Sequence, residues 1–257
     1  FNLLFVPLTL LLLVFLAVGP ATNWKKQSAE VILLPLRKVL LAAVVIAIGV
    51  PLAFFGNWPW HVGVTVGLCA WVLGGQLVDI ARKTQHAATR VQGLKKLTRS
   101  YWGMQFAHLG LLVTALGIAF TTAYSIEKDV RLAPGESITV NDYVFRFDGV
   151  EDHQGPNYVA QRGTLLVSHD GFSETLHPEK RIYRVQQNPM TEAAISGNSF
   201  RDLYVALGEP LDAGAWAVRI YHKPMIRWVW FGAVLMAFGA LLAMLDKRYR
   251  LKATGGR

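Results

Sequence analysis

The chain has 257 residues, of which 53% are hydrophobic and 17% charged, whereas a soluble domain usually carries about 25% charged residues. Its net charge of +9 would suit nucleic acid, but the basic residues gather in short segments beside long apolar runs. That distribution excludes nucleic acid as the expected partner and indicates a lipid bilayer. The single cysteine, Cys69, rules out an internal disulfide or CxxC redox pair.

Five apolar segments are long enough to cross a bilayer, which takes about 20 residues. They are residues 3–19, 39–55, 60–80, 103–123 and 226–245. The first has no basic flank and is longer than a signal-peptide core, so we interpret it as a true span and the chain as a fragment of a longer protein. Pro51 is expected to kink or end the second segment. The short link to Trp60 predicts an antiparallel hairpin of the second and third segments.

Lysine and arginine residues predict the orientation of these spans. The segments after the first span, after the third span and in the tail, residues 246–257, hold four, six and five of the 26 basic residues. In a five-span chain all three segments lie on one side, which is then cytoplasmic. Five tryptophans near span ends are typical of an aromatic belt at the bilayer surface: Trp58, Trp60, Trp102, Trp228 and Trp230.

Residues 124–225 are then expected outside the cytoplasm. They hold 14 acidic and 10 basic residues, and stretches such as DYVFRFDGVE and AWAVRIYHK alternate apolar and polar residues between turn-forming ones. This pattern predicts an inserted all-β domain, a small antiparallel barrel or sandwich. Within it, residues 188–200 are expected to form a loop.

Most polar residues have structural interpretations. His86, His153, His169, His177 and His222 lack metal-ligand spacing and are expected on the surface or in loops. We expect Asp79 to pair with the neighbouring Arg82 or Lys83. No nucleophile motif, phosphate loop or paired carboxylates stand out, so no self-contained catalytic motif is predicted.

His108 is the residue that stands apart, because an ionisable side chain inside a span is costly and indicates function. It could ligate the iron of a haem, or it could make an interhelical hydrogen bond worth about 0.6–2 kcal/mol, and the residues alone favour neither. Gly103, Ala107 and Gly110 would let a flat macrocycle approach the helix, but they suit plain helix packing equally well.

His61, at the outer end of the third span, is expected to be an interfacial anchor beside Trp58 and Trp60. It lies about 20 Å in depth from His108 at 1.5 Å per residue. Two nitrogens bound to the same iron would be only about 4 Å apart, from two metal–nitrogen bonds of about 2 Å. A second axial ligand is therefore expected outside this chain.

Four runs carry a resemblance to a known family: RSYWGMQFAHLGLLVTALGIAF, YSIEKDVRLAPGES, HPEKRIYRVQQNPMTEAAI and WAVRIYHKPMIRWVWFGAVLMAFGALLAMLDKRYR. Together with RDLYVALGE, they resemble the C-terminal part of the CcmF family of cytochrome c-type biogenesis proteins, which are haem lyase subunits. The resemblance covers essentially the whole chain. The family's tryptophan-rich WWD segment, its second transmembrane histidine and its two outer histidines have no match in this sequence.

The resemblance implies a multi-pass protein of the bacterial inner membrane with residues 124–225 in the periplasm and the C-terminus in the cytoplasm. It implies a bound haem b, with His108 as one axial ligand of the iron. It also implies that haem arrives from the chaperone CcmE and that, with CcmH, the protein promotes haem attachment to the CxxCH cysteines of apocytochrome c.

Two alternatives remain open at this point. One is a transporter that passes haem or another solute across the bilayer, although the spans are largely apolar; haem uptake into vesicles would identify it. The other is a structural anchor for a partner-binding β domain, which would be colourless when purified at full length.

Overall fold

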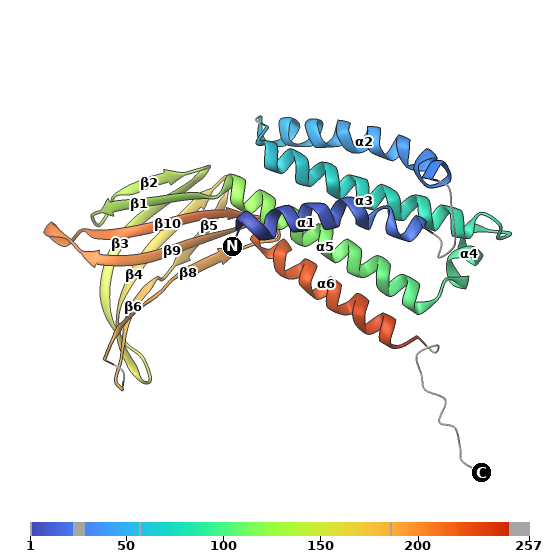
Figure 1. The fold of residues 1–257 in the computed structure, drawn as a ribbon. Coiled ribbons are helices and arrows are strands. Elements are labelled where there is room, and N and C mark those ends of the chain that lie inside the picture. The colour runs from blue at the N-terminus through green and yellow to red at the C-terminus, as the bar shows by residue number, and fades with distance from the viewer. Residues whose placement is uncertain (1, 23–28, 57, 186, 247–257) are drawn as a thin grey trace, which may run out of the picture. The chain divides into compact units, whose positions relative to one another are not determined.

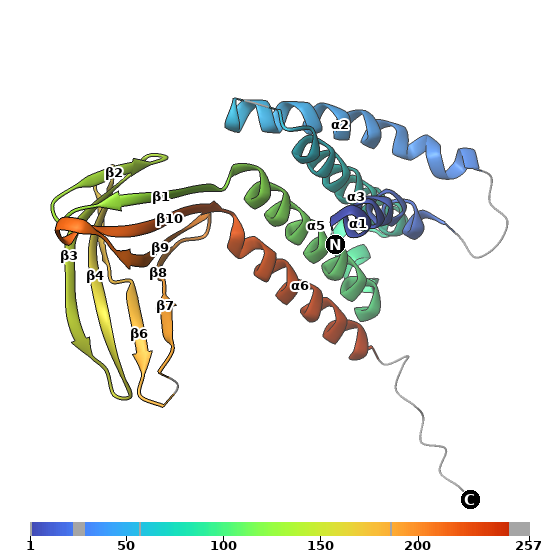
Figure 2. The same ribbon diagram turned by 60° about the vertical axis from the view of Figure 1, so that its left-hand side comes forward.

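The structure is a computed structural model that describes residues 2–22, 29–56, 58–185 and 187–246. The chain forms two compact units. One comprises Phe1–Ala119 with Trp228–Arg257 and is helical, and the other comprises Phe120–Arg227 and holds the strands. Figures 1 and 2 show the elements of each unit. Lys25, Lys26 and residues 247–257 of the predicted cytoplasmic tail lie outside the described residues.

Six α-helices are described: α1 (Asn2–Leu16), α2 (Ala29–Phe55), α3 (Trp60–Thr84), α4 (Arg90–Lys96), α5 (Arg99–Tyr124) and α6 (Ile226–Met244). Among the described residues, four helices are long and apolar enough to cross a membrane, namely α2, α3, α5 and α6. The prediction of five spans was therefore one too many. The remaining predicted span, residues 3–19, corresponds to helix α1, which is described over 15 residues, and to the 3-10 turn at Gly19–Ala21 that follows it.

Helix α2 continues past Pro51 to Phe55 instead of ending at the proline. A proline lacks the N–H that would bond the carbonyl four residues earlier, which here belongs to Ala47. The indole Nε1 of Trp58 donates to that same carbonyl at 2.9 Å. Gly63 makes room for this indole, since a Cβ there would lie 2.5 Å from Nε1. The turn between α2 and α3 thus supplies the hydrogen bond that the proline removes.

The β unit is a sandwich of two antiparallel sheets. One has the order β1-β10-β9-β8; the other has the order β2-β3-β4-β6-β7, with β5 paired to β4. The strands are β1 (Ile126–Leu132), β2 (Ser137–Val140), β3 (Tyr143–Gln154), β4 (Tyr158–His169), β5 (Phe172–Leu176), β6 (Glu179–Tyr183), β7 (Pro189–Glu192), β8 (Ala194–Gly197), β9 (Arg201–Pro210) and β10 (Trp216–Pro224). Of the two predicted forms, a small barrel or a sandwich, the structure shows the sandwich. The expected loop at residues 188–200 was wrong, because β7 and β8 lie there.

The core of the sandwich follows the two-residue period of its strands. Alternate residues of β3 and β10, such as Phe145 and Phe147 or Val218 and Ile220, are fully buried between the sheets. The same alternation turns the side chains of Arg201 and His222 inward near the ends of β9 and β10. At that end, therefore, the interior of the sandwich becomes polar.

Candidate functional site

Helix α5 carries His108, and three glycines spaced seven residues apart fix which face of α5 meets α6. A Cβ on Gly103 would lie 2.5 Å from the carbonyl oxygen of Gly239, and one on Gly110 would lie 2.6 Å from that of Gly232. At Gly117 the same atom would lie 2.8 Å from the backbone nitrogen of Val229. Small residues let helix backbones approach this closely in a bilayer. The space that Gly103 and Gly110 leave is therefore occupied by α6 and does not admit a macrocycle.

His108 lies on the other side of α5, because two residues at 100° each separate it from Gly110 by about 200°. Its neighbours on that side contact α3. Gln76 Nε2 donates to the carbonyl of Gln105 at 3.1 Å, and Cys69 Sγ lies 3.7 Å from the carbonyl of Leu112. Leu112 is buried in the cluster that α1, α3 and α5 share. His108 thus occupies the α3-facing side of α5.

Several polar atoms on this side of α5 lack a hydrogen bond within the described residues. They are Nδ1 of His108 and both amide atoms of Gln105, one turn earlier, and all three are buried. A buried polar group without a partner costs about 1–3 kcal/mol, so such a group calls for a partner such as water, an ion, a ligand or another protein segment. This side of α5 therefore offers a free imidazole nitrogen and a free amide, groups that a cofactor or another protein segment could engage.

A cluster of three polar side chains links the C-terminal end of α3 to the N-terminal end of α5, about two turns before His108 on α5. Lys83 Nζ lies 2.7 Å from both carboxylate oxygens of the buried Asp79, and the hydroxyl of Tyr101 donates to the same carboxylate at 2.7 Å. The Lys83 ammonium also lies 4.7 Å from the centre of the Tyr101 ring. Asp79 therefore has an ion-pair partner one turn along its own helix. Its carboxylate is fully engaged in joining the two helices.

His61 lies far from His108 in depth. The contacts of Cys69 with Leu112 set the two antiparallel helices in register. His61 is eight residues before Cys69, and His108 is four residues before Leu112, so about twelve residues, or about 18 Å, separate them along the axis. The ring of His61 packs edge-on against Trp60, with centroids 5.9 Å apart, and its Nε2 is buried without a partner. The two histidines are too far apart to share one iron.

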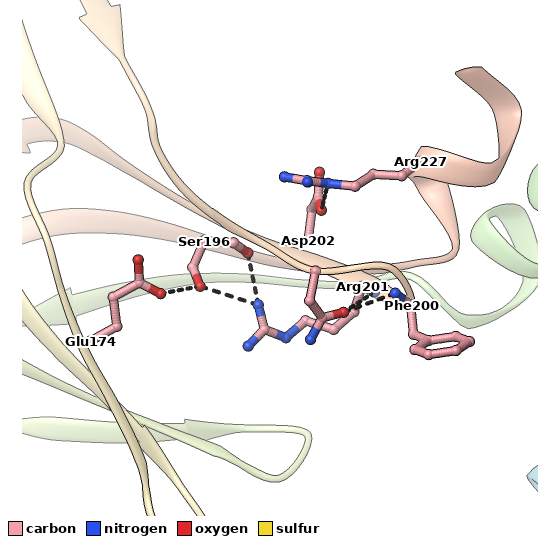
Figure 3. Close-up of polar contacts among 7 residues, drawn as sticks. Glu174, Ser196, Phe200, Arg201, Asp202 and Arg227 are labelled. Carbon is pink, nitrogen blue, oxygen red and sulfur yellow. Dashed lines mark hydrogen bonds and ion pairs between the residues drawn. The ribbon is translucent and has the colours of Figure 1, made fainter. Parts of the chain in front are cut away.

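The β unit holds a polar cluster that the sequence did not reveal, and Figure 3 shows part of it. Arg201 is only 8% exposed. Its Nη1 donates to the backbone and side-chain oxygens of Ser196 at 2.8 and 3.2 Å, and its Nε donates to the hydroxyl of Tyr143 at 3.0 Å. Ser196 in turn donates to the carboxylate of Glu174. The hydroxyl of Ser196 thus links the buried positive charge of Arg201 to the negative charge of Glu174.

His169 and His222 flank Tyr143 in this cluster, with ring centroids 4.6 and 6.0 Å from the tyrosine ring. His169 Nδ1 lies 2.7 Å from the carbonyl of Asp142. Burial lowers the pKa of His222, and the charge of Arg201 lowers it further, while Asp142 opposes the shift. The surface interpretation of His222 was therefore wrong. Its place in the inward series of β10, after Val218 and Ile220, was the signal that could have corrected it.

The remaining histidines have ordinary partners. His86 Nε2 lies 3.0 Å from Gln85 Nε2, His177 Nδ1 lies 3.4 Å from the hydroxyl of Thr164, and the ring of His153 lies 6.5 Å from that of Tyr158. Within the described residues, no three histidine, cysteine or acidic side chains are grouped so that they could hold a metal ion. In the spans, His61 and His108 each have a buried ring nitrogen without a partner among the described residues, and of the two only His108 lies well inside its helix, whereas His61 lies at the end of α3.

The comparisons with known proteins agree with one another. Residues 123–224 match the family model described as the CcmF C-terminal beta-sandwich. The chain is 47% identical over 253 residues to the cytochrome c-type biogenesis protein CcmF of Pseudomonas aeruginosa, covering 98% of this chain and 38% of that protein. It is 40% identical over 255 residues to CcmF of Escherichia coli, covering 99% and 38%.

A solved structure titled Cytochrome c Heme Lyase CcmF matches the fold with a TM-score of 0.79 and 21% identity. The match covers 95% of this chain and 40% of that one. This likeness shows the fold, including the helices and the inserted sandwich. The chain spans about two fifths of the length of the curated relatives it matches.

Proposed function

Because the chain corresponds in sequence and fold to the C-terminal portion of CcmF proteins, we propose that it is the haem-binding part of a cytochrome c maturation complex. The relatives carry the name of cytochrome c-type biogenesis proteins, and the solved homologue carries that of a haem lyase. In this proposal the complex attaches haem through thioether bonds to the CxxCH cysteines of apocytochrome c.

The proposed role of His108 is to be one axial ligand of a haem b within the membrane. The observation that carries it is the orphaned imidazole: His108 lies half-buried on the face of α5 turned away from α6, and its Nδ1 has no partner among the described residues. A bound haem would supply a one-electron redox centre. The chain's own part is to hold the imidazole at a fixed depth on α5, which the glycine contacts with α6 keep in place.

The second axial ligand would come from the part of the protein outside this chain. His61 is excluded by depth, and it is the only other histidine in the four described helices that are long and apolar enough to cross a membrane. The orphaned amide of Gln105 lies one turn from His108 and is suited to face the same missing portion. The site is thus proposed to be completed by another segment.

The proposed orientation places the sandwich in the periplasm of the bacterial inner membrane and the C-terminus in the cytoplasm. Its support does not depend on α1. The basic residues at the end of α3, on α4 and at the start of α5 lie at one end of the spans, opposite the turn between α2 and α3, which has no lysine or arginine. In the proposal the sandwich contacts the haem chaperone CcmE, CcmH and apocytochrome c.

The test is the haem content of the full-length protein carrying His108→Ala, compared with His61→Ala as a matched control in the spans. The proposal expects His108→Ala to lose the b-type haem spectrum and most haem per protein in a pyridine haemochrome assay. Cytochrome c maturation should fall with it, while His61→Ala should retain the spectrum. Unchanged haem and maturation in His108→Ala would remove His108 from the site.

A further inference from the structure

The turn between β8 and β9 presents a large aromatic side chain to the outside of the sandwich. Phe200 is 65% exposed. The turn is rigid, because the side-chain oxygen of Asn198 accepts hydrogen bonds from the backbone nitrogens of Phe200 and Arg201 at 2.8 and 2.9 Å. Figure 3 shows the Phe200 ring pointing away from Glu174 and from the polar cluster. The backbone that carries the exposed ring is therefore held in place on the sandwich.

That place is next to the point where the chain enters a membrane span. The carbonyl of Phe200 accepts a hydrogen bond from the backbone nitrogen of Met225 at 2.7 Å, and α6 begins at the following residue, Ile226. Directly opposed residues of antiparallel strands lie about 5 Å apart. The backbone of Phe200 is therefore held beside the start of the apolar helix Ile226–Met244, which is long enough to cross a membrane.

Further contacts within the same unit fix the start of α6 to this turn. The guanidinium Nε of Arg227 lies 2.7 Å from Oδ1 of Asp202, which is 5% exposed. Gly197 leaves the room that this pair needs, since a Cβ there would lie 2.6 Å from the Asp202 carboxylate. Figure 3 shows Arg227 on the first turn of α6 above Asp202.

The level of the bilayer surface follows from α6 itself. Arg227, with about half of its side chain exposed, and Trp230, which is 72% exposed, lie within the first turns of the helix. Tryptophan is enriched in the layer between headgroups and hydrocarbon, and arginine is also an anchor residue there. The backbone of Phe200, hydrogen-bonded to Met225, lies beside the start of this helix and so near that level. The occupant that fits an exposed phenylalanine at this depth is lipid.

We propose that Phe200 anchors the β8–β9 turn in the interfacial layer of the lipid bilayer, beside the point where α6 enters it. The anchor gives the sandwich a contact with lipid in addition to its two covalent connections to α5 and α6. Nothing in this inference depends on haem or on which side of the membrane the sandwich occupies.

The test places a nitroxide at position 200 and measures its collisions with oxygen, which concentrates in lipid, and with a water-soluble nickel chelate. The full chain would carry Cys69→Ala with Phe200→Cys and be reconstituted in nanodiscs of phosphatidylethanolamine and phosphatidylglycerol. Leu211→Cys in the same background is the matched control. Leu211 is an exposed apolar residue at the opposite end of β9, about 35 Å away along the strand.

The proposal expects an oxygen-to-nickel collision ratio several-fold higher at position 200 than at position 211. Equal ratios, both dominated by the nickel chelate, would mean that residue 200 is in water and would overturn it. Low collision rates with both reagents at position 200 would mean that protein covers the residue, and this outcome would overturn it as well. Because the turn is held by backbone hydrogen bonds and Asn198, Phe200→Cys is expected to leave the fold intact.

Discussion

Replacing Gly110 with alanine should separate α5 from α6. The new Cβ would lie 2.6 Å from the carbonyl oxygen of Gly232 and 2.7 Å from the backbone nitrogen of Met236, whereas ordinary contacts begin at 3.4 Å. Both opposing atoms belong to the backbone, so no side chain can rotate away, and the helices must part by close to 1 Å. Overpacking of this kind costs about 1–3 kcal/mol. Alanine recovers up to about 1 kcal/mol through its higher helix propensity.

The net expectation is a loss of about 0–2 kcal/mol for Gly110→Ala, and of about 1–3 kcal/mol relative to a variant that gains the same helix propensity without overpacking. The matched control is Gly49→Ala in α2, where a Cβ would meet nothing within 4 Å, so only the gain in helix propensity remains. The assay is reversible unfolding of the full chain in mixed micelles by increasing the fraction of SDS, followed by helix circular dichroism. If Gly110→Ala is as stable as Gly49→Ala, the close α5–α6 contact does not exist as described.

Two further predictions concern single side chains. Burial and Arg201 lower the pKa of His222 below its ordinary value of 6.5. Protonation therefore favours the unfolded chain, and the sandwich should lose stability as the pH falls below about 6.5. Hydrogen exchange of β9 and β10 amides at pH 7.5 and 5.5 should show this loss, which His222→Asn abolishes and the exposed-site control His177→Asn does not. Asp246 is 5% exposed and accepts a hydrogen bond from the backbone nitrogen of Ser100 at 2.8 Å. Asp246→Ala should therefore cost about 1 kcal/mol as a lost helix cap and speed amide hydrogen exchange in the first turn of α5. Unchanged hydrogen exchange there would refute the cap.

Hydropathy and strand alternation predicted the elements that depend on local pattern. The segments beginning near residues 39, 60, 103 and 226 all form long helices, and the alternating stretches between them form a sandwich. Pro51 does not end α2, and the segment alone could not show this, because the bond to the free carbonyl comes from Trp58, seven positions along the chain. The short strands β7 and β8 were missed because four residues containing proline or glycine carry no clear period of two.

The candidate site, too, was predictable from the sequence only in part. His108 could be singled out from sequence because a histidine inside an apolar helix is conspicuous wherever the helix packs. The role of Gly103 and Gly110 could not, since both a macrocycle and a second helix require small residues, and only the position of α6 distinguishes them. The cluster around Arg201 brings together residues from β3, β5, β8 and β10, and such a set becomes visible only when strand pairing is known.

The most direct measurement of the proposed role of His108 is chemical rescue in the full-length protein. His108→Gly removes the imidazole and leaves a gap beside the helix, so added imidazole can take its place at the iron. The proposal predicts that the variant has little b-type haem or an altered spectrum and that millimolar imidazole restores the six-coordinate spectrum. The matched variant His61→Gly should bind haem normally and ignore imidazole. A His108→Gly protein with the wild-type spectrum and no response to imidazole would contradict the assignment.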